Sequence, residues 1–252
     1  MMARMSIPRA YSNALRKDLR SRAVWPPIVA VAPGDYGIFR GGVFSRIGNI
    51  TTDFGVSYEV EPGGHQARKF QFHSETDWNL GAEAAGDAAA VKGELSIKLD
   101  GRSSFFVSVA AFDVLRLQSP RNVAVALREL DAWSNLRYFV VWELFTGEDL
   151  VFFGSESGNS TIKVRGSADD VKCFRCSGKV GGSLEFGASG DVGVQLRGAP
   201  GTPATFALNV FRVKAVGDPL SLSFSAPPSD DEVVDFLADD EEYDEESSLL
   251  RI

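Results

Sequence analysis

The sequence predicts an α+β fold, with a twisted, mostly antiparallel β-sheet, surrounding helices and a short C-terminal acidic helix. Glycine and phenylalanine are frequent, at 25 and 18 of 252 residues, as suits strands joined by tight turns. In two long regions apolar and polar residues also alternate with the period of two that strands require. Helical spacing is confined to short stretches near the N-terminus, near residue 120 and near the C-terminus.

The N-terminal stretch 8–22 predicts a short basic helix. Tyr11, Leu15 and Leu19 are spaced by four and form an apolar stripe. The basic residues around this stripe, which are the candidates for lipid binding, are Arg16, Lys17, Arg20 and Arg22. Two interpretations remain open: a helix that packs on the body, or a face that binds anionic lipid headgroups.

Short strands are predicted after the prolines at 26 and 27, which end the helical stretch. Turn residues separate them at Gly41-Gly42 and at Pro62-Gly63-Gly64. The predicted strands are 28–31, 36–39, 43–47, 55–60 and 69–73.

The two alternating regions are the distinctive feature of the chain. In the first, the apolar members are Leu95, Ile97, Leu99, Phe105, Val107 and Val109. In the second, between 179 and 214, they are Leu184, Phe186, Val192, Val194, Leu196, Phe206, Leu208 and Val210. Strands with one apolar and one polar face fit a sheet with one wet side, or a pore with one lipid face and one water face.

Between these regions lie a predicted helix and a predicted apolar hairpin. The helix begins at Ser119-Pro120, with proline at its first position, and carries Val123, Leu127 and Leu130 on one face. The hairpin joins strands 136–145 and 150–154 around the turn 146–149. Both of its strands are expected to be buried on both faces.

The net charge of -8 comes from the C-terminal tail. Eleven of the 34 acidic residues lie between 230 and 246, whereas only one of the 26 basic residues, Arg251, lies beyond 228. Residues 1–228 therefore hold 23 acidic and 25 basic residues. We predict a domain at 1–217 and a tail at 218–252, formed by a Ser/Pro linker and a short acidic helix at 230–242. Its apolar residues are Val233, Val234, Phe236 and Leu237.

The sequence gives little sign of an enzyme. The one candidate for metal or acid–base chemistry is His73-x-Glu75-x-Asp77, which fits a solvated strand face equally well. Cys173 and Cys176 are expected in a turn between strands, as ordinary reduced thiols. No phosphate-binding loop or hydrolase motif is found. We therefore expect no catalytic residue, no metal, no cofactor and no nucleic-acid partner. Without a secretory signal or a long apolar run, a cytoplasmic protein is expected.

From about residue 85 to 216, the order of elements resembles the gasdermin pore-forming domain. The resemblance rests on the alternating region that ends at 105–117, the following helix, the apolar strands 138–145 and 150–152, and the second region that ends at 204–211. It implies an inhibited monomer that proteolysis releases to bind lipid, oligomerise and insert two hairpins per subunit as a β-barrel. The implied outcome is cell death through pores in the inner membrane, and such cell death can serve as antiviral defence against phage.

By this resemblance the inserting segments are 68–112 and 178–213, and the apolar members of the two alternating regions face the membrane. The short tail resembles the inhibitory peptide of bacterial gasdermins. One departure is that bacterial members commonly carry an acylated N-terminal cysteine, whereas no cysteine precedes Cys173 here.

The tail suggests how it is released. No lysine or arginine lies between Lys214 and Arg251, so a trypsin-like protease could not cut the linker. Asp-Glu-Val-Val-Asp, which ends at Asp235, is a candidate for a protease that recognises acidic residues, and the linker 217–229 is the more accessible target. The alternatives that remain open are a non-enzymatic β-sandwich scaffold with an acidic partner-docking tail, and a β-barrel that binds a small ligand.

Overall fold

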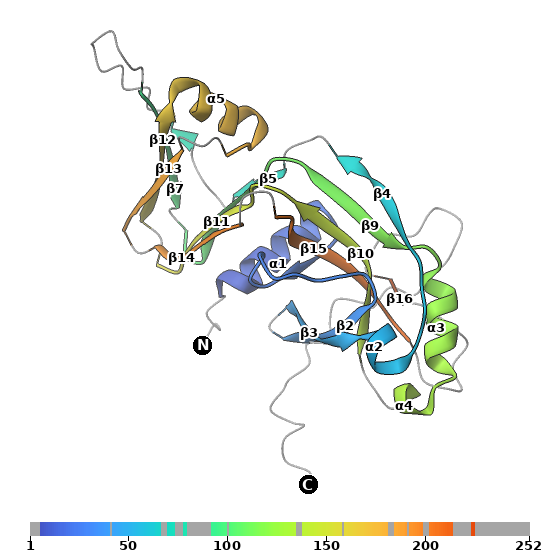
Figure 1. Cartoon of the computed structure of the whole chain (residues 1–252). Helices are drawn as coiled ribbons and strands as arrows, with labels where there is room; N and C mark the ends of the chain where they lie inside the picture. The colour runs from blue at the N-terminus through green and yellow to red at the C-terminus, as the bar shows by residue number, and fades with distance from the viewer. Residues whose placement is uncertain are drawn as a thin grey trace.

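A computed structural model describes residues 6–40, 42–66, 70–73, 78–79, 92–99, 101–134, 138–157, 159–180, 184–190, 192–198, 202–213 and 223–224 (Figure 1). Within these residues the predicted α+β class is confirmed, because the strands form three sheets and the helices lie around them. Of the strand pairs described, only β1 (Arg22–Val24) with β3 (Val43–Asn49) is parallel. The predicted acidic helix at 230–242 lies outside the described residues.

Twelve strands form four long arms that run side by side through the molecule. Arm 1 consists of β4 (Val60–Gln66), β5 (Phe70–His73) and β6 (Trp78–Asn79). Arm 2 consists of β7 (Lys92–Leu99), β8 (Ser104–Val109) and β9 (Phe112–Leu117). Arm 3 consists of β10 (Phe139–Gly147), β11 (Val151–Ser155) and β12 (Ser160–Ser167). Arm 4 consists of β13 (Glu185–Ser189), β14 (Val192–Arg197) and β15 (Ala204–Arg212).

Each arm pairs antiparallel with the next arm in all three sheets. The distal sheet has the order β13-β12-β7-β6, and the middle sheet has the order β14-β11-β8-β5. The proximal sheet contains β15, β10, β9 and β4 together with β1, β3, β2 (Asp35–Arg40) and β16 (Ser223–Phe224). The order of the four arms is therefore the same from one end of the molecule to the other.

Arms 2 and 3 keep a single register from end to end. Lys92 pairs with Ser167 and Arg116 pairs with Glu143, so the pairing advances by 24 residues on each arm, from 92 to 116 and from 143 to 167. No residue is gained or lost where the ladder passes from one sheet to the next. The three sheets are thus bent sections of one four-stranded array.

Two bends divide this array. At the first, the backbone N–H of Ser103 donates to the carbonyl of Glu156 at 3.4 Å, and at the second that of Ala110 donates to Glu148 at 3.5 Å. These bonds keep the arms joined where the sheet changes direction. Left-handed backbone makes the bends sharp, and the non-glycine residues that adopt it are Ser103 (φ 54°), Asp149 (φ 54°) and Asn159 (φ 56°).

The proximal sheet closes on itself, because β10 pairs with both β15 and β2. α2 (Ile50–Phe54), α3 (Pro120–Arg128) and α4 (Asp131–Ser134) lie beside this end (Figure 1). The predicted start of α3 at Ser119-Pro120 is confirmed, and Val123 and Leu127 pack with Trp133 in the core that they share with the sheet. Asn49 caps α2, which was not predicted from the sequence, by accepting from the N–H of Thr51.

The helix predicted at 8–22 is confirmed as α1 (Ile7–Asp18), but it ends earlier, because Arg20 adopts a φ of 53° and the chain enters β1, which places Arg22 on a strand. Two other predictions about the first 60 residues were wrong. No strand forms at 28–31, where Ile28 and Val29 are exposed in a loop. The strand predicted at 55–60 is absent except for Val60, which begins β4, because Gly55 ends α2 in left-handed backbone.

Two predictions about the centre of the chain were also wrong. The hairpin expected from 136–145 and 150–154 does not form, because 148–150 is a bend that carries arm 3 onward from β10 to β11. The turn expected around Cys173 and Cys176 is α5 (Ala168–Ser177), whose N-cap Ser167 accepts from the N–H of Asp170. The alternation predicted for β7 is confirmed, since Leu95, Ile97 and Leu99 are buried and their neighbours are not.

Candidate functional site

All fourteen apolar residues predicted to face the membrane lie in the interior of the fold. Those that are fully buried are Leu95, Ile97, Leu99, Phe105, Val107, Val109, Leu184, Phe206, Leu208 and Val210. Those that are partly buried and packed against a core are Phe186, Val192, Val194 and Leu196. One wet face was expected along each region, but every residue of β8 is buried. The two central strands of the middle sheet, β8 and β11, are therefore covered on both sides, whereas β14 keeps the expected exposed face at Gly193, Gln195 and Arg197.

The distal and middle sheets enclose one core between them. Leu95, Ile97 and Leu99 of β7 pack there with Phe106 of β8 and Phe153 of β11. α5 closes this core with Phe174, whose ring lies 5.6 Å from that of Phe186. The polar face of β7 points outward, where Glu94 accepts from Arg165 Nε at 2.6 Å and lies 3.0 Å from Lys163 Nζ. These two hydrogen bonds lower the pKa of Glu94.

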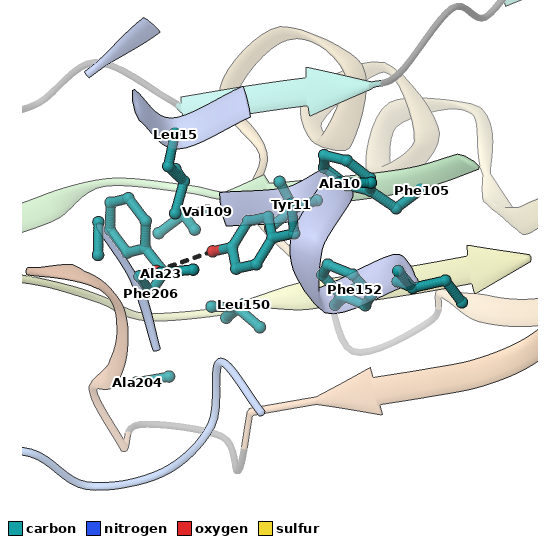
Figure 2. Close-up of a cluster of buried hydrophobic side chains, with 13 residues drawn as sticks. Ala10, Tyr11, Leu15, Ala23, Phe105, Val109, Leu150, Phe152, Ala204 and Phe206 are labelled. Carbon is teal, nitrogen blue, oxygen red and sulfur yellow. Dashed lines mark hydrogen bonds between the residues drawn. The ribbon is translucent and has the colours of Figure 1, made fainter. Parts of the chain in front are cut away.

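The opposite face of the middle sheet is covered by α1 (Figure 2). The ring of Tyr11 lies edge-on against Phe105 and Phe152, with centroids 5.4 and 5.3 Å away. Its hydroxyl donates to the carbonyl of Phe206 at 2.8 Å. Burial raises the pKa of Tyr11 above its usual range. The helix lies so close that a Cβ on Gly154 would be 2.9 Å from Ile7 Cγ2. The interpretation of α1 as a packing helix is confirmed.

The basic end of α1 lies beside β1. Lys17 and Arg20 are exposed, whereas Arg16 and Arg22 are half-buried. The guanidinium of Arg22 sits 5.5 Å above the ring of Phe39. Burial, and then the charge of Arg16, lower the pKa of Arg22 to about 10. The two arginines therefore lie close enough to repel each other.

A second contact between an arginine and an aromatic ring lies next to the contact between Arg22 and Phe39. Phe39 meets Phe139 edge-on, with ring centroids 5.0 Å apart, and the guanidinium of Arg212 lies 6.0 Å from the centroid of Phe139. Arg16, Arg22, Phe39, Phe139 and Arg212 are called the basic–aromatic surface below. Arg212 was not identified from the sequence. Its only signal there was its position two residues after Val210, the last member of the apolar alternation.

A buried carboxylate ties three arms together at the proximal end. Glu143 on β10 accepts from Arg116 Nε on β9 and from Asn209 Nδ2 on β15, both at 2.5 Å. Glu143 and Asn209 are almost completely buried, while Arg116 is half exposed. This cluster was also missed, although a glutamate inside the apolar run from 139 to 145 was a visible signal.

The other candidates from the sequence form no reactive cluster in the part of the chain described. Cys173 and Cys176 are exposed, unbridged thiols on α5. Glu75 and Asp77 of the possible metal site lie outside the described residues. Of the residues that are described, no three histidine, cysteine, aspartate or glutamate side chains form a group that could hold a metal ion. No described helix combines the length and apolarity needed to cross a bilayer.

The chain is similar to a bacterial gasdermin. The solved structure of a bacterial gasdermin from Bradyrhizobium tropiciagri matches 80% of this chain and 85% of that chain, with 13% identity and a TM-score of 0.35. No protein-family model and no curated protein matches the sequence.

Proposed function

We propose that this chain is an autoinhibited pore-forming protein of the gasdermin type. Proteolysis of its C-terminal tail releases it, and it then oligomerises and inserts two β-hairpins, arms 1–2 and arms 3–4, into a membrane to cause cell death. The observation that carries this proposal is the constant order of the four arms in all three sheets, together with the single register that arms 2 and 3 keep from end to end. An array that is already paired can straighten without exchanging any strand neighbour.

The arms are long enough for this role. The 24-residue advance of arms 2 and 3 corresponds to about 80 Å of extended strand, at roughly 3.3 Å per residue. A tilted strand needs only about 9–11 residues to cross the hydrocarbon core of a bilayer. The distal and middle sections therefore suffice to cross, and the proximal section can remain a folded base.

A straightened array would also present one apolar face. Ile97 pairs with Ile162 in the distal sheet and Val107 pairs with Phe152 in the middle sheet. In an array of unbroken register, these pairs point to the same side, because even numbers of residues separate them along each arm. The bend between the sheets divides this face, since the first pair lies in the core under α5 and the second lies under α1.

The proposal assigns the chain to the cytoplasm while inhibited and to the inner membrane after activation. Its partners are an activating protease, anionic lipids and further copies of itself. Arg16, Lys17, Arg20 and Arg22 bind lipid headgroups in this scheme. The exposed apolar side chains of Ile28 and Val29, in the loop after β1, support the assignment because they lie near this basic end in the chain.

Dye release from anionic liposomes tests the proposal. The full chain is compared with the same chain cut in 217–229, and with a chain that ends at Val216. Leakage by the shortened forms alone is expected. If no form leaks at high protein-to-lipid ratio, the pore is refuted and the scaffold alternative stands.

The lipid-binding residues need a separate test. A triple change of Arg16, Lys17 and Arg20 to glutamate is expected to reduce cosedimentation of the cut chain with anionic liposomes. Arg121→Glu on α3 is the matched control, because it alters an exposed charge outside α1. Equal binding by the triple variant and the control contradicts a lipid role for α1.

A further inference from the structure

We infer that the acidic segment 229–246 of this chain docks on the basic–aromatic surface formed by Arg16, Arg22, Phe39, Phe139 and Arg212. The consequence for membrane activity rests on the proposed function, because the tail then covers two of the arginines assigned to lipid. Docking itself is a property of the full, uncut chain.

The direction of β16 leads the tail to this surface. β16 runs antiparallel along the outer edge of β15, with Phe224 opposite Phe211. β1 occupies the same edge three residues further on, with Arg22 opposite Leu208. Three residues of strand span about 10 Å. The direction of β16 therefore points along this edge toward Arg22.

The sequence after β16 fits this path. Pro227-Pro228 follows within four residues, and proline cannot continue a sheet edge as a hydrogen-bond donor. The acidic run begins at Asp230, six residues after Phe224. Six residues reach at most about 20 Å, which is more than the roughly 10 Å to Arg22, so the first carboxylates can reach the end of β1.

The chemistry of the surface matches an acidic, partly apolar peptide. Arg16 repels Arg22, and Arg22 is partly withdrawn from water, so a carboxylate between them relieves both costs. A guanidinium can hold a carboxylate with two parallel hydrogen bonds. The partly buried rings of Phe39 and Phe139 offer apolar contact between Arg22 and Arg212. Residues 229–246 supply eleven carboxylates, no basic group and the apolar residues Val233, Val234, Phe236 and Leu237.

A tethered segment needs only weak intrinsic affinity to stay docked. Its effective concentration is about millimolar, and cutting the chain removes that advantage. The position of the cut then matters. A cut after Asp235 leaves Asp230, Asp231 and Glu232 attached through β16, whereas a cut in 217–222 releases the whole segment together with β16.

Carbodiimide coupling of the full chain at low salt, without lipid, tests the docking site. This reagent joins a lysine directly to a carboxylate that it contacts. Lys17 is expected to link to the 230–246 segment, and Arg22→Lys is expected to add a link to Asp230, Asp231 or Glu232. Arg121→Lys on α3 is the control. Tail carboxylates linked only to other lysines, or linked as often to position 121 as to position 22, overturn the inference.

Proteolysis of the full chain gives an independent readout. Arg16→Glu is expected to raise the initial rate of tail cleavage by a glutamate-specific protease about fivefold, as loss of one ion pair at the upper end of the surface range implies. Arg121→Glu should leave the rate unchanged. Adding Asp230→Arg and Asp231→Arg to Arg16→Glu should restore protection.

An unchanged rate for Arg16→Glu, or no restoration by the charge exchange, contradicts docking at this surface. Dye release decides the proposed function separately. Leakage by the cut chain without a tail link at position 17 or 22 overturns the docking site and leaves the pore standing. A tail link without leakage supports docking and overturns the pore.

Discussion

Asn159 offers a direct test of whether the bends hold the array in its folded form. It lies at the bend between the middle and distal sheets with a φ of 56°, and its side chain is exposed. A side chain other than glycine in this region costs about 1 kcal/mol or more, less for asparagine than for a β-branched residue. Asn159→Gly relieves this cost in the bent form and, in addition, weakens an extended strand by roughly 0.5–1 kcal/mol. Asn159→Val acts in the opposite direction on both counts.

The two variants should therefore change the rate of pore formation in opposite directions. A shift of about 1 kcal/mol in the bent form corresponds to roughly a fivefold change in rate if straightening limits the reaction. In stopped-flow dye release after cutting, Asn159→Gly is expected to slow leakage and Asn159→Val to accelerate it. The melting temperature of the uncut chain should rise for Asn159→Gly and fall for Asn159→Val.

Ser157→Val is the matched control for this experiment. Ser157 is exposed in the same bend but does not adopt a positive φ. Valine at 157 therefore tests hydrophobicity and strand propensity without the cost of left-handed backbone. The reasoning fails if Asn159→Gly and Asn159→Val change leakage in the same direction. It also fails if Ser157→Val accelerates leakage as much as Asn159→Val does.

Three further changes address the covers of the array and the contacts between its arms. Tyr11→Phe should lower the free energy of unfolding by about 1 kcal/mol, because the carbonyl of Phe206 loses a hydrogen bond. Tyr11→Ala should lower it by about 3–5 kcal/mol and should also speed leakage after cutting. Denaturant titration measures both changes, and equal stability of the two variants would argue against α1 as the cover of the middle sheet. Glu143→Ala should lower the free energy of unfolding by about 2–3 kcal/mol, because Asn209 loses this acceptor inside the sheet. Glu143→Gln should lower it less, because the glutamine can still accept from Asn209. The same titration checks this order. The pKa of Glu94 is lower in the folded chain than in the unfolded chain, where it is about 4.3. The ion pairs of Glu94 therefore stabilise the fold above about pH 4.3, and this stabilisation is lost as the pH falls through the pKa of the folded state. From about pH 5 downward, the melting temperature should fall less steeply for Glu94→Gln than for the unchanged chain.

The strands could be predicted where one periodic pattern decided them. Leu95, Ile97 and Leu99 alternate with polar residues, and β7 buries them as that pattern requires. The proline after Ser119 likewise marked the start of α3. In both places, local sequence and final environment demand the same conformation.

The bends could not be predicted, because the pattern does not change across them. Leu99 and Phe105 belong to the same face of one alternating region, yet the structure buries them in different cores. The expected hairpin failed for a related reason. Asp149 in left-handed backbone reads as a hairpin turn in sequence, and only the pairing of β11 with β8 and β14 shows that arm 3 continues beyond it.

The division of one apolar face between two cores has a consequence for activation. Lipid tails are as apolar as a protein core, so side chains such as Val107 lose little hydrophobic stabilisation once they are inserted. The free-energy cost arises between the folded state and the inserted state, when α1 or α5 has moved away and the apolar face is exposed to water. That cost is smallest at a membrane surface, where the exposed face can enter lipid at once. In the proposed mechanism, the arginines at the end of α1 therefore bind lipid before the array straightens. If the tail occupies Arg16 and Arg22 as we infer, it controls insertion from the proximal end, away from the distal and middle sheets that would enter the membrane.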